Sequence, residues 1–271
     1  MKLTKILSLI LAAIMLCTCM VSCGDKKDNE TDDKKDETKE LIVGFDAEFP
    51  PFGYIAEDGS YDGFDLACAK EVCNRLGWNF KAVAIDWNSK DQELKLNNIN
   101  CIWNGFTYTG REDEYTWSDP YVSNKIVMVV KADSGIKTLA DLKGKSVMAQ
   151  AGSSAVDAIN ENADLAASIN MIELADYNLG FMDLNQGSVA AVAADLGVAA
   201  YNMANNDGEY VILDEAVSEE QYAIGFLKGN TELRDAVNEQ LLAMAKDGTM
   251  MKIAENYVDA GLVLESLCLC D

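Results

Sequence analysis

The stretch LIVGFDAEFPPFGYIAEDGSYDGFDLACAKEVCNRLGWNFKAVAI, residues 41–85, decides the fold class. It opens with a short apolar run that ends in an acid, which predicts a buried strand over 41–46. The EDGS motif at 57–60 predicts a hairpin turn. Asp65 is the predicted N-cap of a helix that ends at Gly77, and 78–85 is a second predicted strand. A strand, a helix and another strand in this order indicate parallel strands joined by a crossover helix.

The same alternation continues toward the C-terminus. Further strands are predicted at 101–107, 125–132, 146–150, 171–177, 189–195 and 221–229. Helices are predicted at 91–99, from 153, at 178–187, at 196–206 and at 230–258, the last broken near Asp247-Gly248, with a short helical turn at 139–142. The sequence therefore predicts an α/β protein of two lobes, with ligand chemistry at the carboxyl ends of the strands.

The composition excludes several function classes. The chain has 271 residues, 22 Lys and Arg, 45 Asp and Glu, and a net charge of -23. Such acidity argues against binding to nucleic acids or anionic membrane surfaces. The absence of histidine removes His-dependent triads, His general bases and His-ligated metal sites. The cysteine spacing fits no zinc pattern, so no metal and no cofactor is predicted.

The cysteines of the mature chain carry no assigned disulfide. Beyond Cys23 they are Cys68, Cys73, Cys101, Cys268 and Cys270. Buried thiols, or thiols in the C-terminal tail, are the expectation for all five.

The N-terminus predicts export and lipidation. MKLTK is a positive segment, and the apolar run after it is too short for a comfortable membrane span. MVSC at 20–23 resembles a lipobox, which would make Cys23 the lipidated first residue, with Cys19 as the weaker candidate and an ordinary cleaved signal as the alternative. Residues 25–40 carry 13 charged side chains in 16, so 23–40 is a predicted disordered tether behind a signal peptide at 1–22. We expect a lipoprotein anchored to the membrane outside the cytoplasm.

Polar residues follow four of the predicted strands, where α/β sheets bind ligands. These residues, with the nearby aromatics, form the candidate site: Asp46, Phe49, Phe52, Trp87, Asn104, Gly105, Thr107, Arg111, Gln150, Ser153, Ser154 and Asp195.

Each member also has a purely structural interpretation. Asp46 is suited to cap the following turn, and Asp195, Ser153 and Ser154 are suited to cap helices. Arg111 lies beside three acids and could form a solvated ion pair of little value. Phe49 and Trp87 could be core residues.

Together these residues fit a site for a zwitterion. A buried ammonium needs a carboxylate partner, and a buried carboxylate needs a cation, because unpaired charge in a closed site costs several kcal/mol. The planar guanidinium of Arg111 matches a carboxylate, and the helix start at Ser153 and Ser154 adds N–H donors. Asp195 would take the ammonium. Asp46 and the aromatic rings would face the ligand side chain.

From Leu41 onward the chain resembles the extracellular solute-binding proteins of the polar amino-acid family, the receptors of ABC importers. The matching segments are VGFDAEFPPFGY, DGSYDGFDLACAKEV, NGFTYTGRED, YTWSDPY, LADLKGKSV, QAGSSA, NTELRDAV and KDGTMMKIAENY. The resemblance implies a periplasmic-binding-protein-like fold with two crossover strands, near 126–131 and 222–227. It places lobe 1 at 41–127 and 224–271 and lobe 2 at 128–223.

The resemblance also implies residue roles. Arg111 would clamp the ligand α-carboxylate with help from Thr107 and Ser153 or Ser154, and Asp195 would bind the α-amine with a backbone carbonyl of Asn104 or Gly105. Phe49 and Trp87 would sandwich the side chain. The family usually has one more residue between the threonines and the arginine than TYTGRED provides, which implies either a displaced arginine or a tighter turn through Gly110.

The function predicted from this resemblance is binding of a free amino acid and its delivery to the membrane subunits of an ABC permease, by a protein expected to be monomeric. A polar or cationic side chain is favoured by Asp46 and Glu48, although glutamine or cystine would also suit the aromatics. The alternative is an enzyme on the same fold that resembles cyclohexadienyl dehydratase, with Glu48 as the general acid. A sensor domain that acts on a separate kinase chain is a third possibility.

Overall fold

The computed structural model describes residues 39–270. The predicted signal peptide, Cys23 and nearly all of the predicted tether lie outside this range. Within it, no helix combines the length and the apolar character needed to cross a bilayer.

The first lobe is built on a five-stranded sheet in the order β5-β1-β6-β14-β7. Its strands are β1 (Glu40–Phe45), β5 (Asn79–Ala84), β6 (Cys101–Ile102), β7 (Thr116–Trp117) and β14 (Gly225–Phe226). β1 pairs in parallel with β5 and β6, whereas β14 is antiparallel to its neighbours. The predicted parallel pairing around β1 is therefore confirmed. The last of these strands in chain order, β14, comes from the C-terminal part of the sequence.

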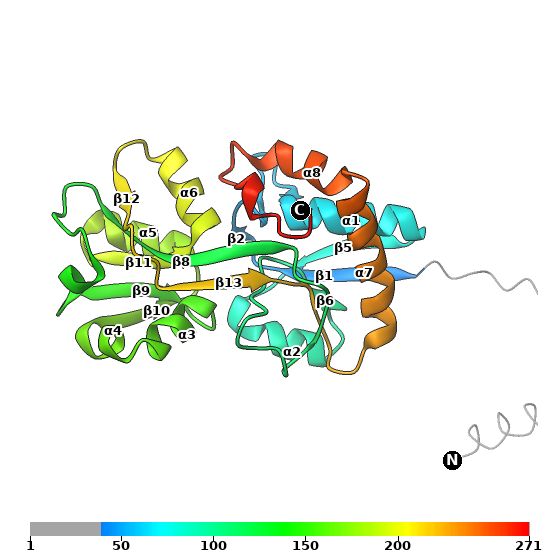
Figure 1. Ribbon diagram of the computed structural model, residues 1–271, viewed down its shortest axis with the longest axis horizontal. Helices are drawn as coiled ribbons and strands as arrows, with labels where there is room; N and C mark the ends of the chain where they lie inside the picture. The colour runs from blue at the N-terminus through cyan, green and yellow to red at the C-terminus, as the bar shows by residue number, and fades with distance from the viewer. Residues whose placement is uncertain (1–38, 271) are drawn as a thin grey trace, which may run out of the picture. The chain divides into compact units, whose positions relative to one another are not determined.

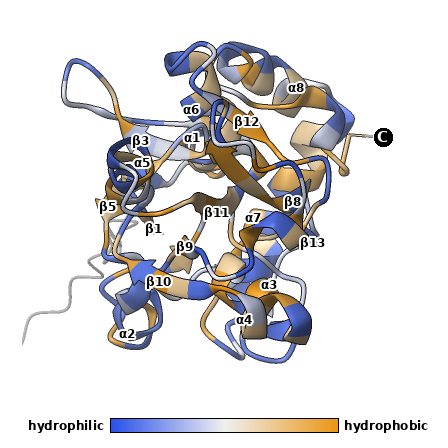
Figure 2. Cartoon of the chain, turned by 90° about the vertical axis from the view of Figure 1, so that its left-hand side faces the viewer, coloured by the Kyte–Doolittle hydropathy of each residue, from blue (hydrophilic) through white to orange (hydrophobic). Residues whose placement is uncertain are grey.

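The second lobe is built on a six-stranded sheet in the order β10-β9-β11-β8-β12, with β13 also paired to β8. The strands are β8 (Val122–Lys131), β9 (Ser146–Gln150), β10 (Asn170–Leu174), β11 (Ala191–Asp195), β12 (Tyr210–Ile212) and β13 (Ser218–Tyr222). β9 is parallel to β10 and β11, and β8 is antiparallel to its three partners. β11 and the part of β8 at 126–130 are largely hydrophobic (Figure 2), and both faces of these segments are buried.

Two antiparallel strands carry the chain between the lobes. β8 follows β7 of the first sheet, and β13 precedes β14, so both crossings use the β8–β13 pair (Figure 1). Val122 is opposite Tyr222 in this pair. The crossing therefore begins at Val122, and residues 126–131 lie farther along β8, paired with β11 and β12. The exact lobe boundaries at 127/128 and 223/224 stay a prediction.

A small third sheet, eight α-helices and four short 3-10 helices complete the described chain; one of the latter, Leu139–Leu142, confirms the predicted helical turn. The third sheet is a meander of β2 (Glu48–Phe49), β3 (Gly53–Ile55) and β4 (Tyr61–Asp62), in which the predicted EDGS turn joins β3 to β4. The helices are α1 (Phe64–Leu76), α2 (Lys90–Lys95), α3 (Ser154–Glu161), α4 (Ala163–Ser168), α5 (Tyr177–Gln186), α6 (Leu196–Asn205), α7 (Thr231–Lys246) and α8 (Thr249–Ala254).

Three strand predictions were wrong in part. The predicted strand 171–177 ends at Leu174, since Tyr177 already begins α5. The predicted strand 221–229 is divided between β13 and β14, because the chain leaves one sheet and enters the other at Ala223-Ile224. The predicted strand 101–107 ends after Ile102, because Gly105 turns the backbone with a φ of 52°. The helix break at Asp247-Gly248 is confirmed, since α7 ends at Lys246 and Gly248 has a φ of 78°.

The thiols of the folded lobes behave as core residues. Cys68, Cys73 and Cys101 are free and buried. Burial raises the pKa of all three, that of Cys73 to about 11. These thiols are therefore protonated at neutral pH and act as small apolar side chains.

Candidate functional site

The predicted polar residues lie at strand ends that meet at the interface between the lobes. Asp46 directly follows β1, and Asn104 follows β6 by two residues. From the second lobe, Gln150 and Asp195 are the last residues of β9 and β11. All four are buried. This is the arrangement expected where the carboxyl ends of neighbouring parallel strands share one edge of a sheet.

Asp46 joins the two lobes directly. One carboxylate oxygen accepts a hydrogen bond from the backbone N–H of Glu48 at 2.9 Å, so the predicted capping of the turn is present. The other oxygen accepts from Nε2 of Gln150 in the second lobe at 2.5 Å. Burial raises the pKa of Asp46, although both hydrogen bonds act in the opposite direction, and Asp176 and Asp86 add to the increase by repulsion.

The turn after β6 is held in place by Asp65. The prediction that Asp65 caps α1 was wrong, because Gly63 occupies the cap position and Asp65 is the second helical residue. Its carboxylate instead accepts a hydrogen bond from the N–H of Gly105 at 2.6 Å. Burial raises the pKa of Asp65 to about 7, and the bond from Gly105 limits the increase. A side chain at Gly105 would come within 2.7 Å of the Phe49 ring, so the turn lies directly against the aromatic residues of the site.

Asn104 connects this turn to the end of β1. Its side-chain oxygen accepts a hydrogen bond from the backbone N–H of Asp46 at 2.6 Å. Its amide nitrogen is buried and has no hydrogen-bond partner in the described part of the chain. A buried donor without a partner is costly, so this nitrogen is available to an acceptor brought by a ligand.

Asp195 lies at the cap position of α6 but does not cap the helix. No hydrogen bond from the helix reaches its side chain. Instead the carboxylate accepts hydrogen bonds from Asn124 Nδ2 at 2.8 Å, from the Tyr222 hydroxyl at 2.5 Å and from the Tyr177 hydroxyl at 3.1 Å. Burial raises the pKa of Asp195, and these three donors hold it down in part. The residue is thus a buried carboxylate surrounded by neutral donors.

Thr107 and Ser154 meet at a residue that the sequence interpretation did not include. Oε1 of Glu220, in β13, accepts hydrogen bonds from Thr107 Oγ1 at 2.9 Å, Ser154 Oγ at 3.2 Å and Asn124 Nδ2 at 2.9 Å. Thr107 belongs to the first lobe and Ser154 to the start of α3 in the second. Ser153 occupies the cap position of α3, yet its hydroxyl makes no capping hydrogen bond.

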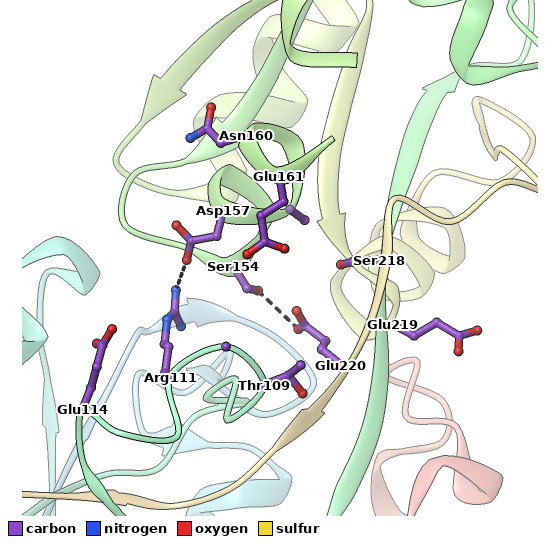
Figure 3. A pocket seen from close by; sticks show the side chains of 12 residues that line it. Thr109, Arg111, Glu114, Ser154, Asp157, Asn160, Glu161, Ser218, Glu219 and Glu220 are labelled. Atoms are coloured by element: carbon purple, nitrogen blue, oxygen red, sulfur yellow. Dashed lines mark hydrogen bonds and ion pairs between the residues drawn. The ribbon is translucent and has the colours of Figure 1, made fainter. Parts of the chain in front are cut away.

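Arg111 reaches across to the second lobe. Its Nη2 is 2.6 Å from Oδ2 of Asp157 in α3, and the two side chains point toward each other in Figure 3. The guanidinium also lies 5.6 Å from the centre of the Phe106 ring. Arg111, Asp157, Ser154 and Glu220 line a pocket of about 430 Å³ between the loop at 109–114, α3 and β13. The predicted ion pair of Arg111 is therefore real, but its partner is an acid of the other lobe.

The aromatic residues divide into two groups. Phe49 lies 5.9 Å, centre to centre, from both Phe52 and Tyr177, which places it at the lobe interface. Trp87 instead packs edge-to-face on Phe106 at 5.5 Å and is buried in the first lobe. The Nζ of Lys90 lies 5.2 Å from the Trp87 ring and donates to the Gly152 carbonyl at 3.0 Å.

Several residues of the site were missed because their signals are weak in a sequence. Tyr177 and Tyr222 are aromatic residues of predicted strands, where core positions are common. Asn124, Glu220 and Lys90 each lie one residue outside an element predicted at 125–132, 221–229 or 91–99. For Asn124 and Glu220 a signal did exist: they are directly opposite each other across the β8–β13 pair, and these strands could have been aligned as the two crossings.

Comparison with known proteins identifies the family. Residues 41–260 match the family model of bacterial extracellular solute-binding proteins, family 3. The chain belongs to this family.

Relatives of this solute-binding protein include two from Bacillus subtilis. The L-cystine-binding protein TcyA is 30% identical over 92% of this chain and 96% of its own length. The arginine-binding extracellular protein ArtP is 29% identical over the same shares of the two chains.

Solved structures extend the likeness to the two-lobed fold. A substrate-binding protein of an ABC uptake transporter from Streptococcus pneumoniae, with bound histidine, has 30% identity and a TM-score of 0.79 and covers 83% of this chain and 94% of its own. An ancestral arginine-binding protein bound to arginine has 36% identity and a TM-score of 0.74, with 80% and 97% covered. The ancestral amino acid-binding protein AncCDT-1, a precursor of cyclohexadienyl dehydratase, has 28% identity and a TM-score of 0.73, with 80% and 95% covered.

Proposed function

We propose that this solute-binding protein binds a free amino acid with a cationic side chain between its lobes and delivers it to the membrane subunits of an ABC permease. One observation carries the proposal. Asp46 and Asp195 are buried carboxylates at the lobe interface, and none of the ion pairs within residues 39–270 includes either of them. Buried carboxylates without a cation are unfavourable, so the site is complementary to a ligand with two positive groups.

The charges of the site have an order that suits a basic amino acid. Asp46 and Glu48 lie at one end, where the carboxyl of Glu48 accepts a hydrogen bond from Asn178 of the second lobe. Burial, Asp176 and Asp46 all raise the pKa of Glu48. Arg111 lies at the other end, with Lys90 close enough that the guanidinium contributes to the lowered pKa of Lys90, after the larger effect of burial. Asp195 would take the α-ammonium, Arg111 the α-carboxylate, and Asp46 the cationic side chain.

Arg111 must exchange partners for this function. In the structure it is paired with Asp157, whose side chain is 59% exposed. An ion pair with such an exposed partner is worth about 1 kcal/mol or less. A ligand carboxylate held in a closed, bidentate geometry is a stronger partner, so Asp157 can be displaced at low cost.

The proposal treats the chain as a binding protein rather than an enzyme. Glu48 is the general acid that the dehydratase alternative requires, and its carboxylate accepts a hydrogen bond from Asn178. The relatives named above are described by the ligands they bind. We expect the purified protein to leave prephenate and arogenate unchanged. The finer features, a lipid on Cys23, attachment to the outer side of the membrane and a monomeric state, are part of the same proposal.

A ligand screen tests the proposal. Thermal unfolding with each of the twenty amino acids and cystine should show the largest stabilisation with a basic amino acid, about 2.7 kcal/mol when the ligand is at a hundred times its Kd. L-Arginine should bind at least tenfold more tightly than L-citrulline, which has nearly the same shape without the side-chain charge. Arg111→Ala should abolish the shift, whereas Arg234→Ala, which removes a surface arginine of α7, should retain it. Equal binding of arginine and citrulline would exclude the proposed role of Asp46, and the absence of any shift would exclude amino-acid binding.

A further inference from the structure

Glu220 lies next to Asp195 in the interior of the site. One nitrogen, Nδ2 of Asn124, donates to Oδ1 of Asp195 at 2.8 Å and to Oε1 of Glu220 at 2.9 Å. The two carboxylates are therefore close neighbours. Asp195 is 3% exposed and Glu220 is 7% exposed, so water screens their repulsion only weakly.

Within residues 39–270, this pair receives hydrogen bonds from neutral donors and forms no ion pair. Glu220 receives the hydroxyls of Thr107 and Ser154, and Asp195 receives those of Tyr177 and Tyr222. No ion pair among the described residues includes Glu220. Hydroxyl and amide donors satisfy the geometry of a carboxylate but leave its charge uncompensated.

The donors around Glu220 come from both lobes. Thr107 belongs to the turn after β6, Ser154 to the start of α3, and Asn124 to β8. A group placed among Thr107, Asp195 and Glu220 would therefore touch both walls of the interface. An ammonium has three N–H donors, and these three side chains are all able to accept a hydrogen bond.

We infer that Glu220 and Asp195 together form a two-carboxylate acceptor for the α-ammonium of the ligand. Glu220 is then a further specificity-determining residue of the site proposed above, and the inference rests on that proposed function. Two carboxylates around one ammonium exclude ligands in which the amine is acylated or absent. They also leave one negative charge, which favours ligands that carry a second cation.

This arrangement makes binding release protons. Burial, and then repulsion by Asp195, raise the pKa of Glu220 from 4.5 to about 7 in the ligand-free chain. An ammonium beside the carboxylate lowers that pKa, so Glu220 loses its proton when the ligand binds between about pH 4.5 and 7. The calorimetric proton count should therefore be a net release at mildly acidic pH.

Other charged groups face Glu220 from the elements packed around it. The same pocket is lined by Arg111, Glu114, Asp157, Glu161 and Glu219. Lys125 of β8 is occupied by Glu219 at 2.8 Å. Burial raises the pKa of Tyr177 and of Tyr222 well above its usual value, so these two hydroxyls stay protonated.

Isothermal titration calorimetry of the mature protein tests the inference. L-Arginine serves as the probe, or the amino acid with the largest thermal shift if arginine gives none. Titrations at pH 6.5 in phosphate and in imidazole buffers, which differ in ionisation enthalpy, give the number of protons released. Glu220→Gln should raise Kd about tenfold or more and remove most of the proton release. The matched control is Glu173→Gln, at an exposed position of β10 in the same lobe; it should change neither quantity.

The outcomes separate the inference from the proposed function. Proton uptake by the wild-type protein, or a Glu220→Gln variant that binds within twofold of wild type or more tightly, overturns the inference while amino-acid binding stands. Because the proton count is measured on the wild-type protein, this result does not depend on how well the variant folds. Failure of the wild-type protein to bind any amino acid overturns the proposed function and this inference with it.

Discussion

Replacement of Asp195 by asparagine should separate ligand binding from folding. The structure indicates that the amide can keep all three hydrogen bonds of the carboxylate. Its oxygen would accept from Asn124 and Tyr222 as Oδ1 does now. Its nitrogen would donate to the hydroxyl of Tyr177, which currently donates to Oδ2 and can turn to accept. The folded protein therefore loses a buried charge and no hydrogen bond.

The replacement should therefore affect the stability of the protein without ligand and its affinity for the ligand in opposite directions. Ligand-free stability should stay the same or rise, because burial raises the pKa of Asp195. A carboxylate whose pKa is raised by folding favours the folded state at low pH, and this contribution is lost as the pH rises through the folded pKa. An asparagine avoids that loss. Ligand affinity should fall, because breaking a buried, hydrogen-bonded charge pair costs about 2–5 kcal/mol. A loss of about 3 kcal/mol corresponds to roughly a hundredfold increase in Kd.

Calorimetric titration at pH 7, with denaturant unfolding of the ligand-free protein, measures both effects. Asp133→Asn, at an exposed position of the same lobe, is the control and should change neither. Binding of an amino acid to Asp195→Asn within threefold of the wild-type affinity would refute the assignment of the ammonium to this side of the site. Loss of binding accompanied by a large loss of ligand-free stability would also refute the reasoning, because the residue would then be structural.

Three further predictions concern other parts of the chain. Unfolding free energy should fall as the pH rises from about 4 to about 7, because burial raises the pKa of Asp65 from 3.8 to about 7; Asp65→Asn should flatten this dependence in urea titrations at pH 4.5 and 7.5. Gly152→Ala should weaken ligand binding more than Gly144→Ala. The φ angles of Gly152 and Gly144 are 70° and 75°, so both replacements strain the backbone to a similar degree. Only at Gly152 would the new Cβ meet a residue of the other lobe, with Asn88 Oδ1 at 3.0 Å. Equal Kd values for the two variants would contradict this. Cys23→Ser should move the protein from the membrane fraction to the soluble fraction, and retention in the membrane would exclude a lipid on Cys23.

The parts of the site that follow from local pattern were predicted from the sequence. β1 and β11 are apolar runs that each lead directly into an acid, and an α/β sheet places such positions at its ligand-binding edge. The burial of Asp46 and Asp195 at the lobe interface agrees with that prediction. The helix stop at Gly77 was predictable for the same reason, since its φ of 67° favours glycine.

The parts that depend on contacts distant in the sequence were not predicted. An acid at the start of a helix usually caps it, and nothing near Asp65 indicates that its partner is the N–H of Gly105. Glu220 lies in β13, whose sequence SEEQY is polar at its first four positions, a composition that normally indicates solvent exposure on both faces. The face that carries Glu220 is buried here because Thr107 of one lobe and Ser154 of the other cover it. The partner of Arg111 depends on where α3 lies, which the shortened TYTGRED turn does not reveal.

The buried acids give a physical reason why ligand binding and lobe closure would be coupled. Contacts between the lobes that need no ligand are hydrogen bonds such as Gln150 to Asp46 and Lys90 to Gly152, and one ion pair with an exposed partner. The exposed ion pair contributes about 1 kcal/mol or less. Each hydrogen bond, which involves a charged group, contributes up to about 3 kcal/mol. Closure also places Asp46, Asp195 and Glu220 in a poorly solvated interface without a cation, at a cost of several kcal/mol for each ionised group. These unfavourable terms oppose the contacts, so closure without a ligand gains less than the contacts alone would give. A ligand that supplies two cationic groups removes the unfavourable term and leaves the favourable contacts, and differential stabilisation of this kind is what shifts the equilibrium to the closed state.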